Sequence, residues 1–435
     1  MKTKEKAVLS PEEKAAKKKA RHKKAGKIIS IIVSVIVLFV IVTSIITVVG
    51  VKSNLKKAEA FPKINTVTLD AENFADGYWN IHTDHGIKIV QLTDVHFGGG
   101  WMSLKKDSMA MNAVASMLKA EKPDFVIVTG DIAYPVPFQA GTFNNKNGAK
   151  LFATLMESLG IYWTVGYGNH DTELYSFFTR EEITDFYSSG DYPHCLVQPG
   201  PADVDGCGNQ MFNIINSDDI ITRTLFVMDS HSYIDGDFLG IMWKYDSMHE
   251  NQIAWYKQMI EENQQHNHDV IAAMSKKDMK RYAGFDAVPS SVFQHIPLTE
   301  YKDAWNEYVE NGKQNTENVK YNYGTVGESG QGIYCGIHED NFFETMLEIG
   351  STDTVFCGHD HLNNFSLNYK GINLNYGYSV DYLAYPGIYK LGSQRGCTVI
   401  KIDEDGNIKH HLENYYQDKY ISDAREDVTM QTLGE

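Results

Sequence analysis

Five largely apolar segments of this chain are followed by Asp, Asn or His side chains, and this recurrence limits the possible folds more than any other feature. The clearest segment is Ile161–Gly166, a β-branched run typical of a buried strand, which leads into Gly168-Asn169-His170-Asp171. Packing alone does not require an amide, an imidazole and a carboxylate at the end of an apolar strand. Strands that end in this way present polar groups at a sheet edge, where catalytic loops commonly lie.

Two earlier segments repeat the pattern. Ile87–Leu92 is followed by Asp94 and His96, and residues 125–128 are followed by Asp131. A predicted helix at residues 107–120 separates the two strands, which indicates a βαβ unit with parallel strands. The carboxyl ends of parallel strands share one edge of a sheet, so we expect these side chains to lie close together.

Two later segments complete the set. A short apolar strand at residues 291–297 contains His295, and a buried strand at residues 354–357 is followed by His359 and His361. Each residue alone has an ordinary explanation, because a strand-end aspartate often caps a helix and a lone histidine often has a core or surface role. Five such strand ends in one chain favour a shared site instead.

The other predicted elements alternate in the same manner. Helices are predicted at 148–159, 179–187, 250–263, 301–310 and 340–347, and strands at 211–215, 223–228, 268–274, 365–369, 372–376, 397–402 and 408–413. Residues 311–332 read as a polar loop that could overhang a site. The last strands favour antiparallel closure of a sheet.

The N-terminal region predicts membrane attachment. Ile28 to Val51 is a stretch of 24 residues without a charge, which is long enough to cross a bilayer as a helix. Residues 1–27 contain eleven Lys or Arg and three Glu, so the positive-inside rule places this basic tail in the cytoplasm. We therefore expect a single-pass protein of the cell membrane, with a stalk and entry segment at 52–84 and an extracytoplasmic domain at 85–425.

A cleaved signal peptide is the alternative, because Ala58-Glu59-Ala60 has the small-x-small form of a cleavage site. The apolar stretch is longer than a normal signal core, however, and a polar, Lys-rich segment separates it from Ala60. An uncleaved anchor is therefore preferred.

The charge balance excludes one class of partner. The chain has a net charge of −16 and its basic tail carries +8, so residues 28–435 carry −24. An acidic body of this kind argues against nucleic-acid binding by a basic surface. A metal site would locally reverse the sign for an anionic substrate. The sequence does not indicate an oligomeric state.

The cysteines do not form a zinc-binding pattern, because there are five of them and none forms C-x-x-C. Cys195 and Cys207 bracket a loop rich in Pro and Gly. They could pair outside the cell, or they could remain free thiols, and the sequence leaves both possibilities open.

The donor types at the five strand ends suit a pair of metal ions. Carboxylate and imidazole ligands favour Mn, Fe or Zn over Ca or Mg. Two divalent ions in one site repel each other, and a shared carboxylate with a bridging hydroxide offsets the repulsion. Such a pair can acidify a water molecule and bind a phosphate at the same time.

The ordered motifs resemble those of calcineurin-like metallophosphoesterases. The order is D-x-H, G-D, G-N-H-D, H and G-H-x-H, and it covers roughly residues 87–402. The segments Gly130–Tyr134 and Val292–His295 also match the G-D-x-x-Y and V-x-x-H motifs of the purple acid phosphatase-like branch. The resemblance implies an α/β (α+β) fold of four layers, a two-sheet β-sandwich flanked by helices, here preceded by one transmembrane helix.

The resemblance also implies roles for the residues. One metal ion would be held by Asp94, His96, Asp131 and His361, and the second by Asp131, Asn169, His295 and His359, with Asp131 bridging. His170 would contact the phosphoryl oxygen or protonate the leaving group, and Asp171 would orient His170. The implied reaction is hydrolysis of a phosphate ester by a metal-bridging hydroxide, without a covalent intermediate.

One position departs from true purple enzymes, in which the motif tyrosine binds ferric iron and the first motif is D-x-G. Here His96 is present and takes that coordination position, so Tyr134 is expected to pack near the site and not to bind metal.

The substrate class implied is a phosphorylated small molecule or a nucleotide. A nucleotidase or phosphodiesterase of the same fold remains an alternative, and so does a catalytically inactive metal-binding surface module. Several aromatic residues could stack on a base or sugar or could belong to the core: Trp101, Tyr376, Tyr378, Tyr382 and Tyr385.

Overall fold

The computed structural model describes residues 10–237, 240–385, 388 and 395–415. The outermost parts of the predicted tail and domain, residues 1–9 and 416–425, lie outside these ranges.

The helices are α1 Pro11–Glu59, α2 Leu104–Glu121, α3 Asn145–Leu159, α4 Arg180–Tyr187, α5 Glu250–Ala273, α6 Lys276–Arg281, α7 Thr299–Glu310 and α8 Phe342–Ile349, with a short 3-10 turn η1 at Ser329–Gln331. The strands are β1 Ala71–Ala75, β2 Tyr78–His82, β3 Ile87–Leu92, β4 Phe125–Thr129, β5 Tyr162–Gly166, β6 Gln210–Ile215, β7 Ile221–Val227, β8 Ser290–Phe293, β9 Val319–Tyr323, β10 Thr352–Cys357, β11 Ser366–Tyr369, β12 Ile372–Tyr376, β13 Gly396–Ile402 and β14 Ile408–Asn414.

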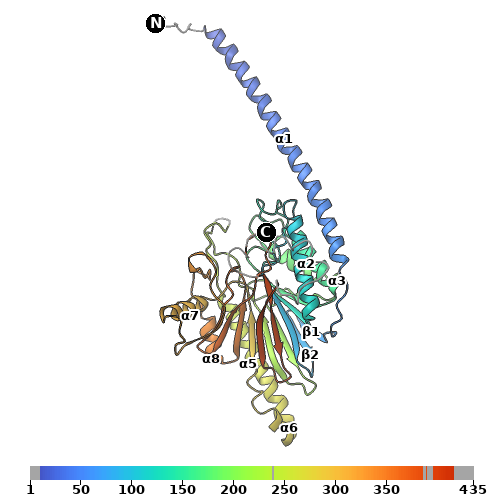
Figure 1. The fold of residues 1–435 in the computed structure, drawn as a ribbon, viewed down its shortest axis with the longest axis vertical. Coiled ribbons are helices and arrows are strands. Elements are labelled where there is room, and N and C mark those ends of the chain that lie inside the picture. Colours follow the sequence, from blue (N-terminus) through green and yellow to red (C-terminus); the bar gives the residue numbers. More distant parts are fainter. Residues whose placement is uncertain (1–9, 238–239, 386–387, 389–394, 416–435) are drawn as a thin grey trace.

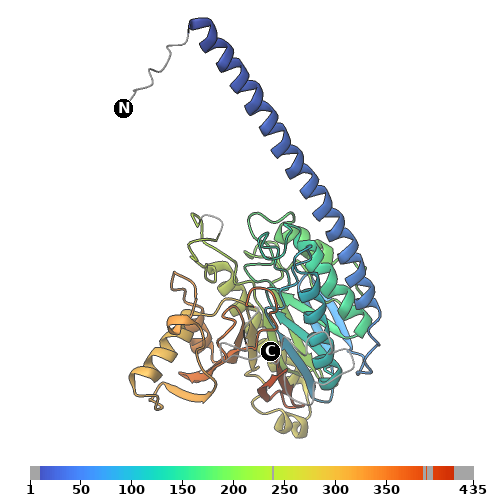
Figure 2. The same cartoon turned by 45° about the horizontal axis from the view of Figure 1, so that its top comes forward.

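The strands form two sheets that pack face to face (Figures 1 and 2). The larger has nine strands in the order β1-β2-β6-β7-β8-β10-β12-β11-β9, and the smaller has five in the order β14-β13-β3-β4-β5. Strands β3, β4 and β5 are parallel to one another, as are β7, β8, β10 and β12. The predicted two-sheet sandwich is therefore confirmed.

Four layers follow from the burial of both faces of each sheet. Ile89 of β3 and Phe356 of β10 belong to the core between the sheets. Val90, the residue after Ile89 in β3, faces the opposite side of the smaller sheet, because side chains alternate along a strand. There it packs with α2 and α3. Helices α5, α7 and α8 cover the outer face of the larger sheet in a third core that includes Tyr256 and Tyr301.

Helix α1 is one continuous helix that starts at a capping box between Ser10 and Glu13. Its apolar part is long and apolar enough to cross a membrane and is not buried against the rest of the chain. Its carboxyl end packs on the domain, where the Asn54 side-chain amide donates to the backbone carbonyl of Leu104 at 2.9 Å. The basic tail and the apolar stretch thus form one rod that is attached to the domain.

The predicted stalk and entry segment at 52–84 is largely structured. Its first part completes α1, and its second part forms β1 and β2 at the edge of the larger sheet. Asp76 and Gly77 join these strands in a tight turn, in which Gly77 has a φ of 77°. Asp-Gly between two strands is a known hairpin signal, so the hairpin was recognisable in the sequence.

Two other predictions are wrong. Residues 268–274 are not a strand but the last part of α5. No Gly or Pro interrupts this helix, and the Asn267 side chain binds the backbone of Ile221, which ties the helix to β7. The predicted polar loop at 311–332 contains β9, the edge strand that pairs with β11.

All five cysteines are free thiols, so the possible Cys195–Cys207 disulfide does not form. Both thiols are half-buried. Burial, reinforced by the nearby Asp229 carboxylate, raises the pKa of Cys207 to about 12. This thiol is therefore protonated near neutral pH and unreactive.

Candidate metal centre and active site

The predicted site residues lie just beyond the carboxyl ends of five strands. Three of these strands, β3, β4 and β5, are neighbours in the smaller sheet, and the other two, β8 and β10, are neighbours in the larger. The sandwich therefore brings both sets of loops to one end of the molecule. A hydrogen bond between His295 Nδ1 and the Thr129 carbonyl at 2.8 Å joins the two sheets at this point.

The backbone of the site is left-handed at four non-glycine residues: Asp94, His96, Asp131 and His359, with φ values of 50°, 55°, 55° and 76°. Such conformations are costly for L-residues and concentrate at functional sites. Although Asp94 and His96 are two residues apart, the alternation of a strand does not set their directions. Both residues follow the end of β3, and their turn backbone, not a pleat, aims the side chains.

Asp131 lies at the centre of the cluster. Its Oδ2 atom is 3.2 Å from Nε2 of His96 and 3.3 Å from Nε2 of His295. Its Oδ1 atom accepts a hydrogen bond from the backbone N–H of His170 at 2.8 Å. One carboxylate therefore faces ligand candidates from both sheets, which is the position that a bridging ligand requires.

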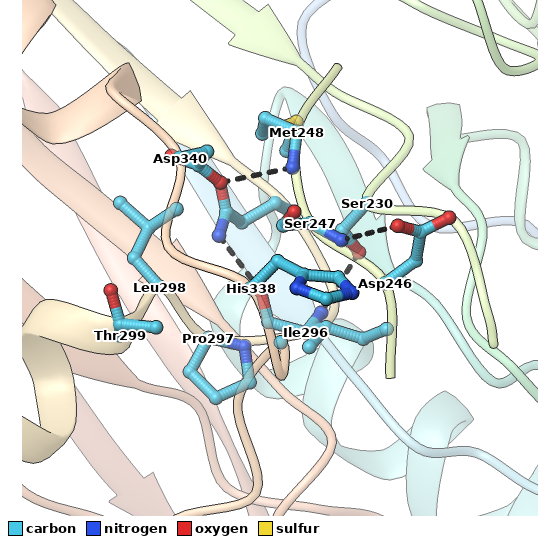
Figure 3. A pocket seen from close by; sticks show the side chains of 12 residues that line it. Ser230, Asp246, Ser247, Met248, Ile296, Pro297, Leu298, Thr299, His338 and Asp340 are labelled. Carbon is cyan, nitrogen blue, oxygen red and sulfur yellow. Dashed lines mark hydrogen bonds between the residues drawn. The ribbon is translucent and has the colours of Figure 1, made fainter. Parts of the chain in front are cut away.

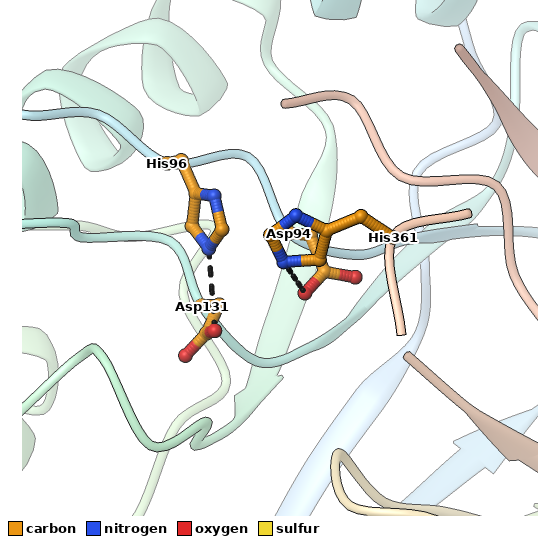
Figure 4. A group of neighbouring side chains, drawn as sticks. All are labelled: Asp94, His96, Asp131 and His361. Carbon is orange, nitrogen blue, oxygen red and sulfur yellow. Dashed lines mark hydrogen bonds and ion pairs between the residues drawn. The ribbon is translucent and has the colours of Figure 1, made fainter. Parts of the chain in front are cut away.

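The first group of ligand candidates is fully formed (Figure 4). Asp94, His96, Asp131 and His361 are buried, and each offers a ligand atom within 4.8 Å of the others. The His361 Nε2 atom lies 3.4 Å from Oδ1 of Asp94. This oxygen is buried and has no hydrogen-bond partner among the described residues.

The second group converges on His295. Because its Nδ1 atom faces the Thr129 carbonyl, its Nε2 atom is the ring nitrogen that faces the site. This nitrogen lies 3.3 Å from Oδ1 of Asn169 and 3.2 Å from Nδ1 of His359. The Asn169 amide nitrogen donates to the Tyr233 hydroxyl at 2.9 Å, which leaves its oxygen directed at His295.

Two glycines permit this close approach. A Cβ atom at Gly168 would collide with the Asp131 carboxylate, and one at Gly358 would collide with the Thr93 hydroxyl. The Gly-Asn-His-Asp and Gly-His-Asp-His motifs thus need glycine for space.

The charge balance suits divalent cations. Burial alone would raise the pKa of the site carboxyls, but adjacent histidines hold the pKa of Asp94 below its usual range and that of Asp131 well below it. Although burial lowers the pKa of an imidazole, the same carboxylates raise the pKa of His295 to about 9 and that of His361 well above its usual range, so a bound cation would replace protons on these imidazoles. These donors fit Mn, Fe or Zn.

A sequence model of the calcineurin-like phosphoesterase family matches residues 87–363, which include every predicted ligand. The chain belongs to this family. It is similar to the probable inactive purple acid phosphatase 29 of Arabidopsis thaliana, with 27% identity over 73% of this chain and 76% of the relative. It is also similar to phosphatase DCR2 of Saccharomyces cerevisiae, with 28% identity over 66% of this chain and 46% of the relative.

Among solved structures, this calcineurin-like protein matches a dimetal phosphatase from Danio rerio at 10% identity and a TM-score of 0.42, over 76% of this chain and 99% of that one. Of the two sequence relatives, the Arabidopsis protein is named as probably inactive and the yeast protein as a phosphatase. The family and its purple acid phosphatase-like branch are as the motifs predicted.

Asp381 is the main site residue that the sequence did not reveal. One of its carboxylate oxygens lies 3.2 Å from Nδ1 of His96 and the other lies 3.2 Å from Nδ1 of His361. It is buried, and three consecutive backbone N–H groups that follow it, including that of Leu383, donate to it. By holding both Nδ1 atoms, Asp381 directs the Nε2 atoms of the two histidines into the cluster.

We expect Asp381→Asn to weaken metal binding by about 10- to 100-fold, because its amide cannot accept from two protonated Nδ1 atoms at once. Metal affinity would be measured by competition with a chelator, and bound metal by mass spectrometry. Asp405→Asn, an exposed carboxylate in the turn between β13 and β14, serves as the control. Equal affinities in the two variants would rule out the positioning role of Asp381.

The partner of His170 is not the predicted one. The Asp171 carboxylate instead accepts from the backbone N–H groups of Asp131, Ala133 and Gly168 at 2.8 to 2.9 Å. It therefore fastens the β4 loop to the β5 loop. Glu173 contacts His170, with 2.6 Å between Oε1 and Nδ1.

The aromatic residues divide between core and site. Tyr134 packs beside His96 and His170, with ring centroids 4.6 and 4.7 Å away, and its hydroxyl donates to Gln139. This agrees with the expectation that Tyr134 packs near the site. Tyr376 and Tyr382 are buried, whereas Tyr385 is exposed and lies 4.8 Å from the His361 ring.

Two nearby features do not belong to the cluster. A cavity between Ser230, Asp246 and Ile296 has a volume of about 10 Å³, enough for one water molecule but not for a phosphate ester (Figure 3). His231 and His249 stack near Asp246, but their ring nitrogens already pair with Gln252, Asp205 and Asp246. His231 is thus held by Gln252 and not by the site.

Proposed function

We propose that this protein is a phosphoesterase that uses two divalent transition-metal ions. The observation that carries the proposal is the convergence of the other six predicted ligands on the buried Asp131 carboxylate, four of them directly or in one buried group and two through His295. Asp94, His96, Asp131 and His361 would hold one ion, and Asp131, Asn169, His295 and His359 the other. Bound ions would supply Lewis acidity toward the phosphoryl group and lower the pKa of a water molecule.

The residues of the chain perform the other tasks. Asp381 and the Thr129 carbonyl contact the Nδ1 atoms of three histidines and so fix which ring nitrogens face inward. The His170 side chain is 25% exposed, so it can reach a substrate while Glu173 holds its Nδ1 atom. In this proposal His170 Nε2 contacts the phosphoryl oxygen or gives a proton to the departing alcohol.

The decisive experiment uses full-length protein in detergent, loaded with Mn²⁺. We expect metal-dependent hydrolysis of 4-nitrophenyl phosphate or of its bis-ester, and loss of turnover when a chelator removes the metal. The ratio of the two rates would separate a phosphomonoesterase from a phosphodiesterase or nucleotidase. Two bound ions without hydrolysis of either ester would favour an inactive binding module.

We further propose that Ile28–Val51 anchors the protein in the cell membrane, with the basic tail inside and the domain outside. The composition of α1 and the eleven basic residues that precede the stretch support this orientation. Protease added to intact cells should remove the domain and spare the tail. Complete protection of the domain would contradict this topology.

A further inference from the structure

The loops that carry the predicted ligands also carry exposed apolar side chains. In the loop after β4, Phe138 is 88% exposed, and in the loop after β5, Leu174 and Phe177 are 79% and 65% exposed. We call the five apolar side chains of these loops that line one groove the apolar rim: the half-buried Trp101 and the exposed Met102, Phe138, Phe143 and Phe177. Exposed apolar groups gathered in this way mark a surface that contacts something other than water.

The apolar rim is continuous. Phe143 and Phe177 stack with ring centroids 6.0 Å apart, and the loops that carry them are joined by a backbone hydrogen bond of 2.9 Å. Met102, Phe138, Phe143 and Phe177 line one groove of about 860 Å³. The rim is thus one surface that spans all three ligand-bearing loops of the smaller sheet.

The opposite wall of this groove is α1. Val40, Thr43 and Val48 line it, and the Phe39 ring meets the Trp101 ring edge-on at 6.0 Å. Figures 1 and 2 show α1 extending away from the domain at the end where these loops gather. The apolar rim therefore lies level with the middle of the uncharged stretch.

This position decides what the rim contacts. A helix rises about 1.5 Å per residue, so the residues from Ile28 to Leu38 cover only about 17 Å. A bilayer core of about 30 Å needs about 20 residues, and the basic tail blocks extension toward the N-terminus. If the stretch spans a bilayer, the bilayer must reach beyond Phe39 and so must meet the rim.

The charges along the groove agree with a phospholipid surface. Lys52 and Lys150 are the charged residues that line it, and both are cationic, although residues 28–435 carry −24 overall. Lysines beside an apolar surface are suited to phosphate head groups. Trp101 and the phenylalanines are side chains that favour the membrane interface.

We propose that the apolar rim lies in the outer leaflet of the membrane and that the substrate is a phosphate ester carried by a membrane lipid. The substrate part rests on the proposed phosphoesterase function. The loops that enter the leaflet carry Asp94, Asp131 and His170, so a lipid phosphate reaches the site without leaving the membrane. Hydrolysis adds the oxygen of water to phosphorus, breaks the phosphorus–oxygen bond to the lipid, and transfers a proton to the departing lipid oxygen.

Membrane contact is tested without activity. Full-length protein is reconstituted into phosphatidylcholine vesicles whose acyl chains are brominated near the head group, and tryptophan fluorescence is compared with that in unbrominated vesicles. We expect Trp101→Phe to reduce the quenched share of the fluorescence, whereas the buried Trp305→Phe does not. Equal quenching in wild type and Trp101→Phe would overturn the membrane position of the rim.

The substrate is tested with esters in vesicles and in solution. The lipid probes are dioleoyl phosphatidate, a monoester, and dioleoyl phosphatidylglycerol, a diester; the soluble probes are the two nitrophenyl esters. Phe138→Ser with Phe177→Ser should slow lipid hydrolysis by at least about tenfold, because two exposed aromatic rings no longer enter the leaflet. Hydrolysis of the soluble esters should not change. The control is Val67→Ser with Phe74→Ser. These two exposed apolar residues follow the carboxyl end of α1 and lie outside the rim, so this variant should change neither rate.

The outcomes separate the two proposals. Wild type that hydrolyses a soluble ester but neither lipid would overturn the lipid substrate, as would an equal loss on both kinds of ester in the rim variant. No hydrolysis of any ester would refute the phosphoesterase function and the lipid substrate together. The fluorescence result would still decide whether the rim contacts the membrane.

Discussion

Replacing Asp131 with asparagine should lower kcat/KM for a phosphate ester by at least about 10³-fold, equivalent to about 4 kcal/mol of transition-state stabilisation. The substitution preserves shape and removes one negative charge. Asp131 is the carboxylate that faces histidines from both sheets, so its loss affects both predicted metal positions. We also expect fewer than two ions per chain.

The measurement has two readouts, steady-state kinetics over a range of Mn²⁺ concentrations and metal content after dialysis. Asp405→Asn is a matched control, because it makes the same chemical change at an exposed turn. Thermal unfolding of metal-free protein would show that the variant still folds. Full activity in Asp131→Asn with two ions retained would exclude Asp131 as the bridging ligand.

His170→Asn should produce the second-largest effect, and its size should depend on the leaving group. Proton donation contributes about 10²- to 10⁴-fold when the departing alcohol is basic. An alkyl phosphate should therefore lose far more rate than 4-nitrophenyl phosphate, whose nitrophenolate departs without a proton. Equal losses would indicate that His170 instead binds the phosphoryl oxygen.

The Glu173→Gln variant tests whether Glu173 is needed to orient His170 while leaving the His170 imidazole in place. The Glu173 carboxylate contacts Nδ1 of His170 at 2.6 Å, so the glutamine variant should show a weaker form of the same leaving-group dependence. Metal content should not change, because the link from Glu173 to a predicted ligand is indirect: the Tyr233 hydroxyl lies between Glu173 and Asn169. A glutamine variant that matches wild type on both esters would show that His170 does not need Glu173.

Much of the fold was readable from local pattern. Strands β4 and β5 are largely buried on both faces, so they appear in the sequence as nearly continuous apolar runs, and β3 begins and ends at the predicted residues. The capping box at Thr179 correctly marked the start of α4. The failure at 268–274 came from a short apolar run, which periodicity alone does not distinguish from part of a helix. At 71–82 the Asp76-Gly77 hairpin signal was present but was not used.

The roles of neighbouring carboxylates were not readable from local pattern. Asp171 follows His170 directly and was expected to orient it, but the chain turns so that Asp171 faces the β4 backbone. Glu173 occupies that place instead. Asp381 lies about twenty residues beyond the last ligand motif, after two further strands, and has no motif of its own.

The sequence by itself determined which residues end the strands, and hence the family, the parallel strands and the seven predicted ligands, because apolar runs and motif spacing are local properties of the chain. The tertiary structure alone decided which carboxylate meets which histidine, and that the ligand loops lie beside the middle of the apolar helix. Those contacts join segments as distant as His96 and Asp381, or Phe39 and Trp101. Only the packing of the two sheets and the two helical layers specifies such distances, so no spacing along the chain could reveal them.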